Sequence, residues 1–155
     1  SFQTLLAANA DTSMHSVISW TPNASALIFT GLDGNRNTQI YIVNSAGQNL
    51  RPLTNGSDQK SDPLWSPDGI HITYSRAMPP TGYHDIFICN SEGGDQRNIT
   101  ATPNDSERYP HWSPEGKRLR FTANEPPNAT LRLADTTTKA ITTLAGEVYG
   151  RGLWD

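Results

Sequence analysis

Hydrophobic and polar residues alternate with a period of two in short runs along most of the chain, and turn-forming residues separate these runs. The alternating runs that come shortly after a tryptophan are residues 27–30, 70–74 and 119–122. A second set is more continuously apolar and lies further along, at residues 39–43, 85–89 and 131–134. Because side chains of a strand point alternately to its two faces, both sets predict short β-strands.

A five-residue turn sequence precedes each strand of the first set. It reads Trp65-Ser66-Pro67-Asp68-Gly69, returns as Trp112-Ser113-Pro114-Glu115-Gly116, and is degenerate as Trp20-Thr21-Pro22-Asn23-Ala24. Proline fixes the first corner of a tight turn, aspartate favours the next, and glycine takes the left-handed conformation that closes it. We therefore predict a structural role in a repeated turn for Pro67, Asp68, Gly69, Pro114 and Gly116.

The tryptophans give the period of the repeat. Trp20, Trp65, Trp112 and Trp154 are separated by 45, 47 and 42 residues. Repeats of about 40 to 50 residues that are built from strands are typical of β-propeller blades. The sequence therefore predicts an all-β propeller in which Trp20, Trp65 and Trp112 pack between neighbouring blades.

Each predicted blade has four antiparallel strands, of which the innermost ends at the tryptophan. The innermost strands are expected at residues 14–20, 60–65 and 108–112, and the outermost at 50–54, 96–100 and 140–144. The three blades would then span residues 14–54, 60–100 and 108–144, with an outer strand of a preceding blade at 1–7 and an inner strand of a following blade at 149–155. Known propellers close with about four to eight blades. Three blades are too few to close a ring, so we expect either a segment of a larger propeller or an arc that self-associates to close the ring.

Composition excludes several classes of protein. The net charge is -3, and no run of basic residues is present, which argues against a nucleic-acid partner. No stretch of 18 apolar residues occurs, so membrane insertion is not expected. The single cysteine, Cys89, excludes an internal disulfide and lies in an apolar run that predicts a buried, inert thiol. The chain begins with Ser1 rather than methionine, which suggests processing or a longer parent sequence.

The central blade carries the pattern of a known family. The order Pro-x-Trp-Ser-Pro-Asp-Gly, strand, Asp-Ile-Phe-Ile, then Gly-Gly-x-x-Arg-x-Ile-Thr runs over residues 63–100, and residues 110–116 restart it. This pattern resembles the TolB-type propeller repeat. The resemblance implies a propeller of six or more blades, often periplasmic or secreted in bacteria and often a platform for protein binding. It also implies that the motif residues are structural, so no catalytic residue follows from it.

One predicted loop has the composition of an interface. Residues 76–84 join two strands of the central blade and include Arg76, Met78, Tyr83 and His84 on either side of two consecutive prolines. Tyrosine and arginine anchors provide much of the energy of protein interfaces. We predict exposed side chains here that bind a partner, the alternative being a stiff surface loop whose Met78 and Tyr83 fold back on the blade.

Charged residues in the predicted blade-to-blade connections would surround the mouth of the central channel, on the same face as this loop. They are Asp58, Lys60, Asp62, Asp105, Glu107, Arg108, Glu147 and Arg151. Such residues can bind a partner or a cation, although loop-tip charges are more often simply solvated. We include Asp105, Glu107, Arg108 and Arg151 in the predicted partner-binding set.

Nothing in the sequence predicts a metal, a cofactor or a catalytic centre. The four histidines, at positions 15, 71, 84 and 111, fall at different levels of the predicted blades and are expected to be structural. No nucleophile elbow, zinc-protease helix motif or phosphate-binding glycine loop is present.

The loop composition and the resemblance to the TolB-type repeat together imply a non-catalytic scaffold that binds a protein or peptide through its loop face, in the bacterial periplasm or outside the cell. Two alternatives stay open. The chain could be the accessory propeller of a peptidase or lyase, or a self-associating arc with a structural role.

Overall fold

The structure is a computed structural model that describes residues 17–124 and 127–146. These residues form twelve β-strands in three four-stranded antiparallel sheets. Among them there is no helix, and so none that could cross a bilayer. The prediction of an all-β chain is confirmed.

The sheets follow one another in chain order, and within each sheet the strand order is the order in the sequence. The first sheet contains β1 (Ser19–Trp20), β2 (Ala26–Leu32), β3 (Thr38–Asn44) and β4 (Arg51–Pro52). The second contains β5 (Lys60–Trp65), β6 (His71–Met78), β7 (Tyr83–Asn90) and β8 (Arg97–Asn98). The third contains β9 (Glu107–Trp112), β10 (Arg118–Ala123), β11 (Thr130–Asp135) and β12 (Ile141–Gly146).

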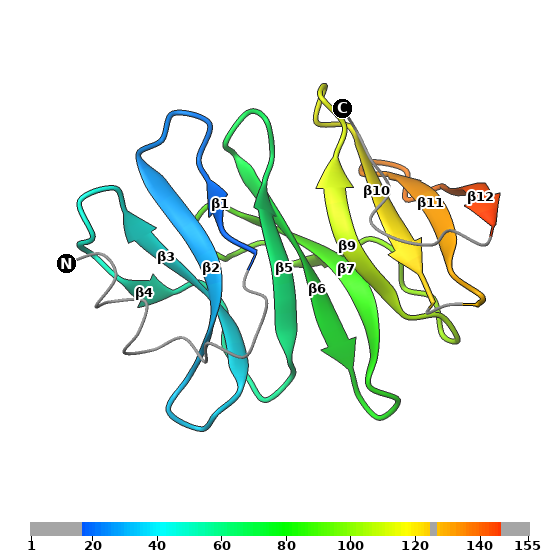
Figure 1. Cartoon of the computed structure of the whole chain (residues 1–155), viewed down its shortest axis with the longest axis horizontal. Helices are drawn as coiled ribbons and strands as arrows, with labels where there is room; N and C mark the ends of the chain where they lie inside the picture. The colour runs from blue at the N-terminus through cyan, green and yellow to red at the C-terminus, as the bar shows by residue number, and fades with distance from the viewer. Residues whose placement is uncertain (1–16, 125–126, 147–155) are drawn as a thin grey trace.

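The three sheets stand side by side as blades of an open arc, with the second between the first and the third (Figure 1). The first strands of the blades face one another, since β5 contacts both β1 and β9. The three sheets do not close into a ring. This agrees with the sequence, which predicts fewer blades than a closed propeller needs. We call the seam between the first two blades seam 1–2, and the seam between the last two blades seam 2–3.

The repeated turn forms as its sequence predicts. The Gly69 N–H donates to the Ser66 carbonyl at 2.9 Å, and Gly69 takes a φ of 72°. The Asp68 carboxylate accepts hydrogen bonds from the Ser66 hydroxyl at 2.5 Å and from the Ile70 N–H at 2.9 Å. These bonds lower the pKa of Asp68 and leave it committed to the turn.

The other two blades keep this turn. Gly116 donates to Ser113 at 2.8 Å and has a φ of 70°. In the first blade Ala24 donates to Thr21 at 2.8 Å and has a φ of 56°, even though its Cβ disfavours that conformation. The degenerate sequence of the first blade therefore retains the geometry without the glycine.

The two faces of each central strand supply different seams. In β7, Phe87 and Cys89 lie in the apolar cluster of seam 1–2, which also holds Ile28 from β2 of the first blade and Trp65 from β5. The alternate residues of β7 join the cluster of seam 2–3, which consists of Ile86, Ile88, Ile99, Leu119, Phe121, Ala123 and Ala134. The central blade is thus buried on both faces, as a propeller requires.

Blades one and two also interlock through backbone at their outer edge. Gly93, in the hairpin between β7 and β8, has a φ of 83°. A Cβ added there would lie 2.0 Å from the Leu53 carbonyl oxygen of the first blade. Beside this contact, Arg51 forms an ion pair of 2.5 Å with Glu92.

The tryptophans differ in burial. Trp65 is 8% exposed and packs in seam 1–2, while Trp112 is half-buried against seam 2–3 and its Nε1 donates to the Leu64 carbonyl at 3.4 Å. Trp20 in the first blade is 49% exposed, so no described neighbouring blade buries it. The strand expected at residues 1–7, which belongs to the preceding blade, lies outside the described residues, so packing of Trp20 between blades stays a prediction.

The predicted loop at residues 76–84 is much shorter in the structure. β6 continues to Met78 and β7 begins at Tyr83, so Arg76 pairs with Asp85 and Met78 pairs with Tyr83 in the ladder. Only residues 79–82 form the connection. The strands expected at 1–7 and 149–155, and the start of the one expected at 14–20, lie outside the described residues, as do Arg151 and Trp154.

Candidate functional site

The connections between strands lie on two opposite faces of the arc. The turn face carries the repeated turns and the hairpins between third and fourth strands. The loop face carries the hairpins between second and third strands and the connections between blades. Each of these faces has a cavity at its surface.

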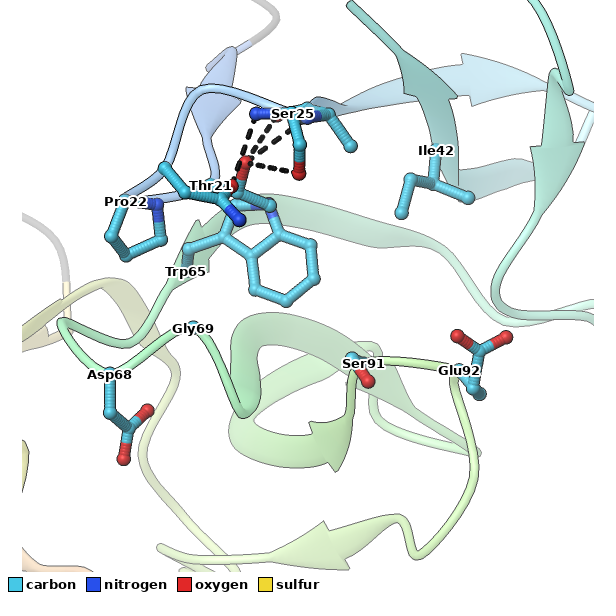
Figure 2. A pocket seen from close by; sticks show the side chains of 11 residues that line it. Thr21, Pro22, Ser25, Ile42, Trp65, Asp68, Gly69, Ser91 and Glu92 are labelled. Atoms are coloured by element: carbon cyan, nitrogen blue, oxygen red, sulfur yellow. Dashed lines mark hydrogen bonds between the residues drawn. The ribbon is translucent and has the colours of Figure 1, made fainter.

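The turn-face cavity lies over seam 1–2 and has a volume of about 320 Å³ (Figure 2). Its polar groups are largely occupied by their own turns. The Thr21 hydroxyl bonds with the Ala26 backbone at 3.1 Å, and the Asp68 carboxylate caps the turn that follows Trp65. Because these groups stabilise the fold, this cavity offers little polar recognition.

The loop-face cavity lies within the second blade and has a volume of about 330 Å³. Its walls combine the hairpin between β6 and β7 with the connection from β8 to β9, and its lining residues are Met78, Pro79, Thr81, Tyr83, Asp85, Asn98, Ala101, Thr102 and Pro103. Tyr83 is 44% exposed, whereas Asp85 is 5% exposed. The cavity therefore has an apolar, partly exposed rim and a buried carboxylate.

Asp85 is held by neighbours on both sides of the cavity. Its Oδ2 accepts a hydrogen bond of 2.6 Å from the Asn98 side chain on β8. The carboxyl group of Glu107, the first residue of β9, lies close enough for Asp85 to raise the pKa of Glu107. Two carboxyl groups from adjacent blades therefore meet directly behind the cavity.

Glu107 is 0% exposed and is bonded to the connection that precedes it. Its Oε2 accepts from the Thr100 hydroxyl at 3.1 Å, and its Oε1 accepts a short hydrogen bond from the Thr102 hydroxyl. Burial, reinforced by the negative charge of Asp85, raises the pKa of Glu107 to about 7. Glu107 thus carries a proton for part of the time at neutral pH.

The positive charge nearest to Glu107 is shared with another carboxylate. Arg132 Nη1 lies 3.9 Å from Glu107 Oε1 but only 2.6 Å from Asp105 Oδ2. Asp105 also accepts from the Asn124 side chain at 2.9 Å, and these two bonds lower its pKa. Arg132 is therefore used mainly to neutralise Asp105.

Seam 1–2 has a buried lysine at the position where seam 2–3 has the buried carboxyl group of Glu107. Lys60, the first residue of β5, is almost fully buried, and its ammonium donates to the carbonyls of Asn55 at 2.7 Å and Asp58 at 2.8 Å. Burial lowers its pKa. The Asp58 carboxylate pairs with Arg76 at 2.6 Å, and this pairing lowers the pKa of Asp58 although burial opposes it.

His84 and Arg108 form a further contact across seam 2–3. Arg108 Nη2 lies 3.1 Å from His84 Nδ1, and the His84 N–H donates to the Ser106 hydroxyl at 3.2 Å. Burial, together with the charge of Arg108, lowers the pKa of His84 to about 4. The imidazole is therefore neutral at physiological pH.

These contacts separate the predicted partner-binding residues into those that are buried or ion-paired and those that line the loop-face cavity. His84 and Glu107 are buried, so their expected exposure is wrong, and Asp105 is paired with Arg132. Arg76 is held by Asp58, with its guanidinium 4.9 Å from the centre of the Phe87 ring. Of the predicted set, Met78 and Tyr83 line the loop-face cavity.

Sequence reasoning did not single out Asp85, Asn98 or Thr102. The available signal was the polar first position of the otherwise apolar run Asp85-Ile86-Phe87-Ile88. No group of three or more His, Cys, Asp or Glu side chains within residues 17–124 and 127–146 could hold a metal ion. The described contacts also form no nucleophile and base pair.

Comparison with known proteins agrees with this geometry. Residues 6–150 match the family described as the TolB beta propeller domain. The chain belongs to this family. Dipeptidyl-peptidase 5 of Porphyromonas endodontalis is 32% identical over 71 residues, which is 46% of this chain and 10% of the peptidase. The Tol-Pal system protein TolB of Nitratidesulfovibrio vulgaris is 35% identical over 51 residues, 33% of this chain and 12% of that protein.

Solved structures of similar fold include TolB propellers and an enzyme. TolB from Acinetobacter baumannii superposes with a TM-score of 0.71 at 18% identity, over 86% of this chain and 33% of that one. An oligogalacturonate lyase from Vibrio parahaemolyticus superposes with a TM-score of 0.67 at 12% identity, over 85% of this chain and 41% of the lyase. At these identities the TolB-type fold is what is shared, and this TolB-family chain spans half or less of the length of its matches.

Proposed function

We propose that this TolB-family chain is a non-catalytic scaffold whose loop face binds a protein or peptide. The observation that supports it most is the loop-face cavity, where Met78, Tyr83 and two prolines surround a buried polar group. Tyrosine and methionine are enriched in the cores of protein interfaces, and fixed polar groups give orientation and specificity.

The size of the cavity indicates what it accepts. Ligand pockets usually have volumes of roughly 300 to 1,000 Å³, and this cavity of about 330 Å³ lies at the lower end. It is suited to one side chain of a partner rather than to a whole cofactor. The prolines of its rim reduce the conformational entropy lost on binding.

The proposed location is the bacterial periplasm or the outside of the cell. The named relatives are bacterial, and one is a Tol-Pal system protein. A net charge of -3 does not favour a nucleic acid as the partner. Fractionation of the source cells tests the location, which would be wrong if the protein stayed with the cytoplasmic fraction.

Site-specific photo-crosslinking tests the binding face. A photoreactive residue is placed at Thr81, on the rim of the loop-face cavity, and in a second variant at Asn23, on the turn face. We expect discrete protein adducts from Thr81 and none from Asn23. Adducts from Asn23 alone, or from neither position in the source cells, would contradict the proposal.

The match to a dipeptidyl-peptidase favours a second candidate, an accessory propeller beside a catalytic domain. In that case the adducts from Thr81 would form within the parent polypeptide or with a peptidase. A third candidate is an arc that self-associates to close a ring. Light scattering of the 17.0 kDa chain across a dilution series tests it, because a stable multiple of that mass is expected.

A further inference from the structure

The loop-face cavity has an uneven distribution of charge. The partner of Asp85 Oδ2 is the neutral amide of Asn98, and the second carboxyl group behind the cavity belongs to Glu107. The nearby guanidinium of Arg132 is 2.6 Å from Asp105 but 3.9 Å from Glu107. The buried end of the cavity is therefore rich in carboxyl oxygens and poor in cations.

The walls of the cavity suit a long side chain with a charged end. Tyr83, Met78 and Pro103 provide apolar and aromatic surface between solvent and Asp85. Arginine packs its methylene groups along such surface, and its planar guanidinium stacks on aromatic rings and bonds to carboxylates with two parallel hydrogen bonds. A metal ion is less suited, because no group of three ligating side chains occurs among the described residues.

From this complementarity we infer that the loop-face cavity is a subsite for an arginine side chain of the bound protein or peptide, with the guanidinium at Asp85 and the stem against Tyr83. This inference rests on the proposed binding function and names the chemistry of its ligand. Asn98 fixes the orientation of the Asp85 carboxylate, and Glu107 adds a second acceptor once it is deprotonated.

Binding at this subsite is linked to protons. The titratable and charged groups that face Glu107 are Asp85 on β7 and Arg132 on β11, and Asp105 holds Arg132 in place. A guanidinium at Asp85 offsets the negative charge there and favours the ionised form of Glu107. Since Glu107 is mostly protonated at pH 6 and mostly ionised at pH 8, affinity for the guanidinium should be higher at pH 8 than at pH 6.

The test is an NMR titration of the full chain with N-acetyl-arginine methylamide, with N-acetyl-citrulline methylamide as the uncharged analogue of equal shape. We expect the arginine compound to shift the amide signals of Asp85, Asn98 and Thr102. The citrulline compound should bind at least about tenfold more weakly, since a hydrogen bond to a charged group contributes roughly 1.5 to 3 kcal/mol. Affinity should rise from pH 6 to pH 8.

Two variants locate the site. Asp85→Asn removes the carboxylate, and Tyr83→Ala removes a wall of the cavity whose side chain is 44% exposed. Each should weaken binding of the arginine compound severalfold or more, while Glu92→Gln on the turn face should not change it. Equal binding of arginine and citrulline, a pH-independent affinity, or stronger binding of N-acetyl-glutamate methylamide would overturn the inference. Adducts from Thr81 together with any of these results would leave the binding function intact and reject only its arginine chemistry.

Discussion

Glu107 and His84 should make opposite contributions to the pH dependence of stability. Both are buried in the second and third blades, and each is shifted away from its charged form. The pKa of Glu107 rises from 4.5 to about 7, and the pKa of His84 falls from 6.5 to about 4. Replacing either one alone should reveal the contribution of the other.

The signs follow from proton linkage. Between pH 4.5 and 7 the unfolded chain has lost the Glu107 proton while the folded chain keeps it, so this group lowers stability as pH rises. Between pH 4 and 6.5 the unfolded chain binds a proton at His84 that the folded chain does not, so this group raises stability as pH rises. Over the shared interval the two effects oppose each other.

The magnitudes are similar. One pKa unit corresponds to about 1.4 kcal/mol, and over pH 5 to 7 each group changes the free energy of unfolding by about 2 kcal/mol. The native chain should therefore be almost equally stable at pH 5 and pH 7. Glu107→Gln should gain about 2 kcal/mol over that interval, and His84→Gln should lose about 2 kcal/mol.

Urea denaturation followed by tryptophan fluorescence at pH 5, 6 and 7 measures these slopes by linear extrapolation. Glu92→Gln, which removes an exposed carboxylate and its surface ion pair with Arg51, is the control and should keep the slope of the native profile even if that ion pair contributes a little stability. The charges that act on His84 are those of Arg108, Asp62 and Asp85, so its pKa should survive the change at Glu107. A Glu107→Gln profile as flat as the native one would refute the assigned burial of both groups.

Three further stability predictions use the same denaturation assay. Lys60→Met should cost on the order of 3 kcal/mol, because the Asn55 and Asp58 carbonyls lose the buried ammonium that donates to them, and native-like stability would show that the ammonium is not stabilising. Trp65→Ala should cost about 3 to 5 kcal/mol and the half-exposed Trp20→Ala about 1 kcal/mol or less, whereas equal losses would contradict their different burial. Gly82→Ala should cost roughly 1 to 2 kcal/mol, because its φ of 74° disfavours a side chain. Gly93→Ala should cost at least about 2 kcal/mol more than that, because its Cβ would clash with Leu53. A smaller difference between the two variants would mean that the blades do not approach so closely.

Much of the fold could be predicted because its determinants are local. The turn at Ser66, Asp68 and Gly69 is specified by residues that bond to one another, and alternation alone identifies the strands that follow. The extension of β6 and β7 to Met78 and Tyr83 was missed, because prolines and a glycine beside these residues resemble a loop. Pairing across the ladder decides that extension, and pairing is not a local property.

The candidate site was harder to predict, since its residues come from separate parts of the chain. Lys60 and Glu107 look like solvated charges at loop tips, yet the connections fold over them and supply their hydrogen bonds. His84 similarly looks exposed beside Tyr83, but strand alternation turns it inward. Only the contact between adjacent blades shows that Asp85 and Glu107 meet.

The opposite charges of Lys60 and Glu107 also bear on how tandem repeats assemble correctly. Neighbouring blades of similar sequence can exchange partners during folding, which leads to misassembly in repeat proteins. At the same position in each connection, seam 1–2 requires a cation bonded to carbonyl groups, and seam 2–3 requires a carboxyl group bonded to hydroxyl groups. Those partners lie only two to seven residues before Lys60 and Glu107, so each connection carries the partners of its own buried charge, and exchanging the two connections would leave both charges without their hydrogen bonds.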